Sequence, residues 1–112
     1  MDPNLMQNLK SELRRGTQML AVLSQLEKMQ YGYSLLQDLT EKNVQIEAGT
    51  LYPLLRRLDT QGLLESEWDT SESRPRKYYR LSKEGIQIYE ELKQEWKDIV
   101  SEIEKLTGGE TK

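Results

Sequence analysis

The sequence predicts a mainly α-helical fold with one small β-hairpin. Through most of the 112 residues, apolar side chains recur every three or four positions, which is the spacing of one face of an α-helix. Between residues 63 and 81 this pattern gives way to two short runs with strand chemistry, separated by a polar loop. Because 36% of the residues are hydrophobic and 31% are charged, the chain can form one domain around one modest core.

The N-terminal part of the sequence predicts two helices. The first runs from Asn4 to about Met29 and becomes more buried in its second half. Gly16 interrupts it at a cost of about 1 kcal/mol relative to alanine, so we expect a neighbouring element to pack closely there. The second helix covers 33–42 and ends at Asn43. The apolar positions of the two helices are Leu5, Leu9, Leu13, Met19, Leu20, Val22, Leu23, Leu26, Leu35, Leu36 and Leu39.

A third predicted helix is amphipathic. An interior proline lacks the N–H that a helix needs, so we expect the regular helix to begin near Thr50, with Pro53 inside its first turn. Gly62 is expected to end the helix. One side carries Leu51, Leu54, Leu55 and Leu58, the opposite side carries Gly49, Pro53, Arg56 and Thr60, and the margins carry Thr50, Tyr52 and Arg57.

Two strands and a last helix complete the chain. The strands are predicted at 63–69 and 76–81, with Leu64 and Trp68 on one face of the first, and the loop between them is longer than a two-residue turn. Ser82 is expected to cap the last helix, and residues 108–112 are expected to form a flexible tail. A narrow apolar seam follows this helix at Ile86, Tyr89, Leu92, Trp96, Ile99, Ile103 and Leu106.

Composition excludes several classes of function. The chain has no cysteine and no histidine, so the commonest metal ligands and the commonest general base are missing. No cofactor and no metal site is predicted, and no pair of carboxylates, lysines or tyrosines converges as a catalytic site. The first residues lack the apolar core of a signal peptide, and no segment has the length to span a bilayer, so we expect a cytoplasmic protein without a membrane partner.

The charge is distributed unevenly along the chain. The formal net charge is −3, which by itself argues against binding to nucleic acid. Residues 48–83, however, hold 7 basic and 5 acidic groups, whereas residues 84–112 hold 4 basic and 8 acidic groups. Fields from exposed charges decay over roughly 10 Å at ordinary salt, so a cationic face can coexist with an acidic total.

The order of these elements is that of a winged helix-turn-helix domain, predicted over residues 1–82. The third helix would enter a DNA groove, and the basic hairpin beside it would meet phosphates. The helix over 83–107 is predicted to serve dimerisation.

Three segments resemble the PadR family of bacterial transcriptional repressors: GYSLLQDL, EAGTLYPLLRRLDTQGLL and SRPRKYYRLSKEG. The similarity extends roughly from Arg15 to Trp96, in the same order and with similar spacing. GTLYPLLRRL followed by RPRKYYRL is a specific combination. The single C-terminal helix is similar to that of the family's short subtype.

The resemblance implies a homodimer in which the N-terminal and C-terminal helices pack across a two-fold axis. The two winged domains would then bind successive major grooves of a pseudo-palindromic operator in double-stranded DNA. It further implies release of the DNA by a small aromatic ligand, because family members respond to phenolic acids or planar cationic drugs. In some members a tryptophan of the last helix lines a pocket at the dimer centre, and Trp96 resembles it in position. The expected dimer interface comprises Leu5, Leu9, Ile86, Tyr89, Leu92, Trp96, Ile99, Ile103 and Leu106.

The candidate DNA contacts come from two helices and the hairpin: Tyr33, Gly49, Thr50, Tyr52, Pro53, Arg56, Arg57, Arg74, Arg76 and Lys77. Arg56 lies nearest the centre of the exposed side, whereas an ion pair with a nearby carboxylate is the alternative for Arg57. Packing in the protein is the alternative for Tyr33 and Tyr52, and solubility of the hairpin is the alternative for its three cations. Trp96 is either a ligand contact or ordinary dimer core. Arg14 and Arg15 are weaker candidates.

We therefore predict a homodimeric DNA-binding repressor that responds to a small ligand, and not an enzyme. The competing hypothesis is a winged-helix adaptor that binds proteins and has no role with nucleic acid. The two hypotheses differ in whether the cations of the hairpin matter for retention of DNA.

Overall fold

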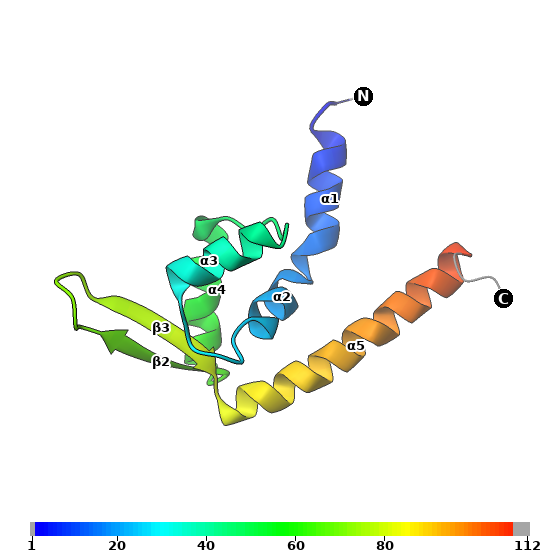
Figure 1. Ribbon diagram of the computed structural model, residues 1–112. Helices are drawn as coiled ribbons and strands as arrows, with labels where there is room; N and C mark the ends of the chain where they lie inside the picture. Colours follow the sequence, from blue (N-terminus) through cyan, green and yellow to red (C-terminus); the bar gives the residue numbers. More distant parts are fainter. Residues whose placement is uncertain (1, 109–112) are drawn as a thin grey trace.

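A computed structural model describes residues 2–108 of the chain. As predicted, it is mainly α-helical with a small antiparallel sheet and a long last helix (Figure 1). The predicted tail falls beyond the described residues except for Gly108, which ends the last helix in a left-handed conformation. The elements in chain order are α1 (Leu5–Arg15), α2 (Gln18–Ser24), β1 (Gln30–Tyr31), α3 (Gly32–Glu41), α4 (Ala48–Thr60), β2 (Leu64–Asp69), β3 (Arg76–Leu81) and α5 (Lys83–Thr107).

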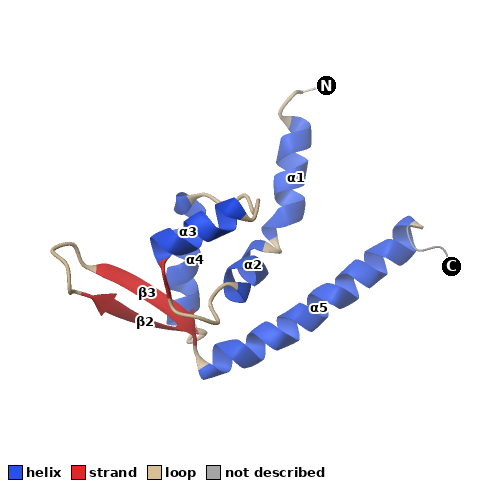
Figure 2. Cartoon of the chain, in the orientation of Figure 1, coloured by secondary structure: helices blue, strands red, loops and turns tan. Residues whose placement is uncertain are grey.

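The sheet has three strands in the order β1-β3-β2, all antiparallel to their neighbours (Figure 2). The hairpin of β2 and β3 was predicted and is confirmed. Strand β1 was not predicted, because two residues are too few to show an alternating pattern. It pairs Tyr31 with Tyr78 and Gln30 with Tyr79. The start of α3 is thereby fixed to the hairpin.

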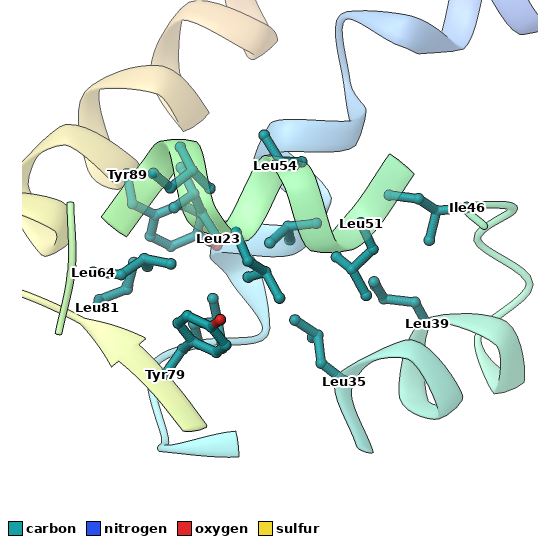
Figure 3. Packing of buried hydrophobic residues seen from close by; sticks show 14 residues of the cluster. Leu23, Leu35, Leu39, Ile46, Leu51, Leu54, Leu64, Tyr79, Leu81 and Tyr89 are labelled. Carbon is teal, nitrogen blue, oxygen red and sulfur yellow. The ribbon is translucent and has the colours of Figure 1, made fainter. Parts of the chain in front are cut away.

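The core lies around α4 (Figure 3). Leu51, Leu55 and Leu58 are completely buried on the predicted apolar side of this helix. Figure 3 shows leucines of α3, side chains of the sheet and Tyr89 of α5 converging on the same helix. The core is therefore centred on the apolar side of this helix, which the amphipathic pattern of the sequence predicted.

The single N-terminal helix predicted over residues 4–29 is wrong, because α1 and α2 are separate helices. Thr17 breaks the chain of helical hydrogen bonds: its hydroxyl donates to the carbonyl oxygen of Arg14 at 2.8 Å, and its N–H donates to the same oxygen at 3.0 Å. The close neighbour expected at Gly16 is absent too, since a Cβ added there would meet nothing within 4 Å in the described chain.

Helix α4 begins earlier than predicted. It starts at Ala48 rather than near Thr50, which places Pro53 in its second turn. Since proline has no N–H, the carbonyl of Gly49 loses its donor within the helix. Gly49 is exposed, so water can replace that donor. The predicted end is confirmed: Gly62 has a φ of +84°, and its N–H donates to the carbonyl of Asp59 at 3.0 Å.

The start of α5 is clamped onto the turn between α4 and β2. As predicted, Ser82 caps the helix, and its hydroxyl oxygen accepts the N–H of Gly85 at 2.9 Å. The same hydroxyl donates to the carbonyl of Gly62 at 2.7 Å. A Cβ at Gly85 would lie 2.0 Å from the carbonyl oxygen of Leu63, so only glycine permits this approach. The direction in which α5 leaves the domain is therefore set by backbone contacts.

Helices α1 and α5 both project away from the packed body (Figure 1). The radius of gyration is accordingly 16.7 Å, against about 13 Å for a compact chain of this length. Over residues 2–108, none of the helices combines the length and apolar character that crossing a membrane requires.

Candidate nucleic-acid interface

The outer side of α4 is free of the protein's own core. Gly49, Thr50, Pro53, Arg56 and Arg57 are all exposed, and they are the candidates that the sequence placed on this side or its margins. The ion pair considered as an alternative for Arg57 does not form, because no carboxylate within residues 2–108 pairs with Arg56 or Arg57. Two guanidinium groups are therefore available on one helix face.

Tyr52 and Tyr33 have different surroundings. Tyr52 is half-buried against the start of α3, where a Cβ added at Gly32 would lie only 2.7 Å from Cε1 of its ring. This glycine therefore makes room for the ring. Tyr33 is 64% exposed, and its hydroxyl accepts a hydrogen bond from Nε2 of Gln37 at 3.1 Å. Core packing, the alternative for Tyr33, is wrong.

Between α4, the start of α3 and the hairpin lies a groove of about 370 Å³, which we call the wing groove. Five aromatic rings and three cations line it. The rings belong to Tyr31, Tyr33, Tyr52, Trp68 and Tyr79, and the cations belong to Arg56, Arg76 and Lys77. It therefore brings together five of the candidate DNA contacts from three separate parts of the sequence.

The other candidates of α4 face a different concavity. It has a volume of about 1230 Å³ and lies between α1 and the outer side of α4. Gly49, Thr50, Pro53 and Arg57 line it from α4, and α1 contributes Arg14 and Arg15. The neighbouring residues Arg56 and Arg57, about 100° apart around the helix, therefore line different concavities.

The hairpin cations are held to different degrees. Lys77 lies near the loop end of the hairpin, opposite Trp68, and its Nζ is 3.5 Å from a carboxylate oxygen of Asp59 and 5.7 Å from the centre of the Trp68 ring. Arg76 pairs with Glu72 at 3.5 Å, and its guanidinium lies 4.3 Å from the centre of the Tyr31 ring. Arg74 is exposed in the loop and forms no ion pair within the described chain. Arg74 is therefore the least constrained of the three cations.

A polar cluster that the sequence did not suggest fixes the hairpin to β1. The hydroxyl of Tyr31 donates to Oδ2 of Asp69 at 2.5 Å, and Oδ1 accepts from the N–H and the hydroxyl of Ser71 at 3.0 and 2.7 Å. The hydrogen bond from Tyr31, followed by those from Ser71, lowers the pKa of Asp69 to about 2. The same bond to Asp69 raises the pKa of Tyr31. Tyr31 also meets the Tyr78 ring edge-to-face, with centroids 5.0 Å apart.

This cluster had no signal in the sequence, because its two main partners are 38 positions apart and belong to no local motif. Trp68 was likewise not a candidate. It shares a face with Leu64 as predicted, yet it is 62% exposed whereas Leu64 is buried. The hairpin extends beyond α4 (Figure 1), so its far end has no core to cover it.

The two projecting helices carry the expected dimer residues. Most of them are exposed: Leu5, Leu9, Ile86, Trp96, Ile99, Ile103 and Leu106. Tyr89 and Leu92 differ, because Tyr89 is buried in the chain's own core and Leu92 packs against that core. These two side chains therefore have less exposed surface for contact with a second chain than the others.

Comparison with known proteins adds independent evidence. Residues 19–91 match the family described as "Transcriptional regulator PadR-like family". The chain is similar to the crystal structure of a PadR family transcriptional regulator from Eggerthella lenta, with 46% identity and a TM-score of 0.89 over 97% of this chain and 96% of that one.

Two further relatives are less similar. A PadR-like transcription factor from Bacteroides fragilis is 36% identical, with a TM-score of 0.74 over 88% of this chain and 98% of that one. The transcriptional regulator Rv3488 of Mycobacterium tuberculosis is 33% identical over 65% of this chain and 68% of its own length.

Proposed function

Because the chain belongs to the PadR-like family of transcriptional regulators, we propose that it is a homodimeric repressor that binds operator DNA and leaves it when a small aromatic ligand binds. Members of this family are transcriptional regulators and not enzymes. A regulator of transcription acts where the chromosome lies, so the proposal places the protein in the bacterial cytoplasm.

The proposal rests mainly on the outer side of α4, which is exposed and carries two arginines. A helix that is buried on one side and exposed on the other, with Arg56 and Arg57 free of carboxylates in the described chain, has the shape and charge to enter a major groove. Thr50 lies near its N-terminus, where backbone N–H groups favour phosphate. In this proposal Arg56 and Arg57 contact bases or phosphates, and Thr50 contacts the backbone.

The hairpin supplies the second set of contacts. Arg74 at its tip is free to reach a phosphate or the minor groove, whereas Arg76 and Lys77 are already oriented by aromatic rings. Lys77 is also tied to α4 through Asp59. The hairpin and the recognition helix would therefore approach DNA as one unit.

Dimerisation follows from the apolar faces of the projecting helices. α1 has no buried residue, and its apolar face includes Leu13 with 81% of its surface exposed. The seam of α5 ends at Leu106, which is equally exposed. Apolar stripes of this length are costly to leave in water, and a second copy offers matching ones. A two-fold dimer would place two α4 helices roughly 34–36 Å apart, one turn of B-DNA.

Ligand release is proposed to act at the dimer centre. Trp96 lies on the exposed seam of α5, where two copies related by a two-fold axis would face each other across a flat aromatic molecule. A ligand that binds there more tightly in one spacing of the two halves than in the other shifts the dimer away from the DNA-binding spacing.

The test measures DNA affinity against salt concentration, with an operator selected from a random duplex pool. Changing Arg56→Ala and Arg76→Ala together should weaken binding and reduce the slope of log affinity against log salt by roughly one for each phosphate that the variant no longer neutralises. Arg80→Gln is the matched control. It removes a cation from the same hairpin, but Arg80 lies outside the wing groove and pairs with Glu65. Unchanged affinity and slope in the double variant would favour the adaptor hypothesis.

A further inference from the structure

The concavity between α1 and α4, which we call the α1 concavity, contains two arginines to which the proposed function gives no role. Arg14 and Arg15 line it from the last turn of α1, and Arg57 lines it from α4. All three are exposed, and none of them pairs with a carboxylate within residues 2–108. Among the described residues of the lining, Glu47 is the only acidic one, so the lining has a net positive charge.

The uncharged residues of the lining suit a polar partner. Most of them carry an amide or a hydroxyl group, among them Gln7, Ser11, Gln18, Asn43 and Thr50. These side-chain types, together with arginine, commonly bind the phosphates of DNA. A pocket for a drug-sized ligand is instead lined mainly by apolar and aromatic side chains, and no aromatic residue of the described chain lines this concavity. The lining therefore favours a row of phosphates over a small organic molecule.

The two faces of α1 have different surroundings. At about 100° per residue, Arg14 lies about 180° from Leu5 around the helix, and Ser11 lies about 200° from Leu9. The apolar face of α1 therefore points away from the α1 concavity, and α1 itself stands clear of the body (Figure 1). A partner chain on the apolar face would leave the concavity open. Arginines in a last turn also stabilise the helix dipole, but that role does not require them to face α4.

The width of a DNA groove gives a reason for cations on two sides of α4. An α-helix with its side chains is about 10–12 Å across and the major groove is about 12 Å wide, so a helix in the groove has a phosphate backbone on each side. Arg56 lines the wing groove beside the hairpin, whereas Arg57 lines the α1 concavity. The hairpin and α1 thus flank the outer side of α4 on different sides.

We propose that the α1 concavity holds the backbone of the DNA strand that borders the major groove on the side away from the hairpin. Arg14 and Arg15 contact its phosphates together with Arg57. This inference rests on the proposed function, because it requires α4 in the major groove. It also links DNA contact to dimerisation: α1 has no residue buried in its own chain, so a partner on its apolar face would hold the two arginines in place.

Ethylation interference on the selected operator locates the phosphates that the full chain requires. Arg14→Gln combined with Arg15→Gln should relieve interference at phosphates across the major groove from those that Arg76→Ala relieves. A dimer of this variant lacks four cations, so the slope of log affinity against log salt should fall by up to roughly four. Arg14→Lys combined with Arg15→Lys keeps the charge and should retain most of the slope.

Lys10→Gln is the matched control. It removes a cation from the same helix, but Lys10 lies outside the lining of the α1 concavity. The slope and the interference pattern should both stay as in the wild type. Because Arg14 and Arg15 are exposed and lie off the apolar face of α1, sedimentation should give the same assembly state for every variant.

The inference is overturned if the double glutamine variant keeps the wild-type slope, if Lys10→Gln lowers the slope equally, or if the relieved phosphates are those that depend on Arg76. Calorimetry with ATP tests the alternative of a free phosphate ligand. Binding of ATP that requires Arg14 and Arg15, with an unchanged interference pattern, would assign the concavity to a nucleotide instead. DNA binding that depends on Arg56 and Arg76 alone overturns this inference only, whereas a chain that retains no DNA from the pool refutes the proposed function as well.

Discussion

The body formed by α2, α3, α4 and the sheet contrasts with α1 and the distal part of α5. In the body, Leu23, Leu55 and Leu58 have no exposed surface at all. On the projecting helices, Leu13 and Leu106 each keep 81% of their surface exposed, although the apolar periodicity is as regular there. Apolar side chains at the same helical spacing are therefore buried within the chain in the body, whereas on the projecting helices they stay exposed.

On the proposed function, this difference separates two tasks of a DNA-binding dimer. The relation between recognition helix and hairpin is built into one chain, through the core and through the contacts of Asp59 and Tyr31. On the proposed function, the relation between two half-sites depends on how two chains pair through their projecting helices. A ligand that acts on the pairing can therefore change operator binding without disturbing either winged body.

The largest expected effect comes from the joint between the two regions. In Gly85→Ala the new Cβ would lie 2.0 Å from the carbonyl oxygen of Leu63, a backbone atom that cannot swing aside. The start of α5 must move and lose the Ser82 cap, so we expect the free energy of unfolding to fall by about 3 kcal/mol or more. Urea denaturation followed by circular dichroism measures this change.

Gly16→Ala is the matched control for that variant. Nothing in the described chain lies within 4 Å of a Cβ at this position, and its backbone is already helical. We expect stability to stay unchanged or to rise by up to about 1 kcal/mol. Equal losses of stability in the two alanine variants would show that crowding against the Leu63 carbonyl is not the reason why position 85 requires glycine.

A charged residue on the apolar seam of α5 should dissociate the proposed dimer without unfolding either region of the chain. Ile103 is half-exposed in the single chain, so Ile103→Glu leaves the winged body intact but places a charge in the proposed dimer interface. We expect the dimer dissociation constant to rise about 100-fold or more, with an unchanged helical spectrum. Sedimentation measures the assembly state. Lys105→Gln, about 200° further round the helix, should leave the assembly as it is.

The sequence predicted what depends on local periodicity and chain order. The amphipathic α4, the hairpin, the Ser82 cap and the Gly62 terminator each rest on a few neighbouring residues, and each is confirmed. The break at Thr17 was missed because the helical apolar pattern continues across it. The early start of α4 was missed because proline tolerance suggested a later one.

The candidate site was predictable as a set of residues but not as an arrangement. The cations of α4 and of the hairpin were identified from the sequence, yet nothing local indicates that Arg56 and Arg57 line two different concavities. The cluster of Tyr31 and Asp69 depends on β1, whose two residues pair only with a strand far along the chain. Such long-range contacts leave no periodic trace in one sequence.

A subtler variant tests whether this cluster orients the hairpin. Tyr31→Phe keeps the ring beneath Arg76 and beside Tyr78, and removes only the hydroxyl that binds Asp69. We expect a several-fold loss of DNA affinity with an unchanged salt slope, because no cation is removed. Arg76→Ala should instead lower the slope. If Tyr31→Phe binds DNA as the wild type does, the orientation of the hairpin does not depend on this hydrogen bond.

The smallest effect is a shift in the titration of Asp69. Its pKa is about 2 in the folded chain against an ordinary value of 3.8, so the stabilisation it provides is present above 3.8 and is lost as the pH falls toward 2. Because the bond from Tyr31 is the largest cause, Tyr31→Phe should raise the carboxyl midpoint toward 3.8 without reaching it, since the two bonds from Ser71 remain. Carbon-13 NMR of the Asp69 carboxyl group follows this titration directly. An identical midpoint in both proteins would mean that the two hydrogen bonds from Ser71, and not the bond from Tyr31 of β1, hold the carboxylate.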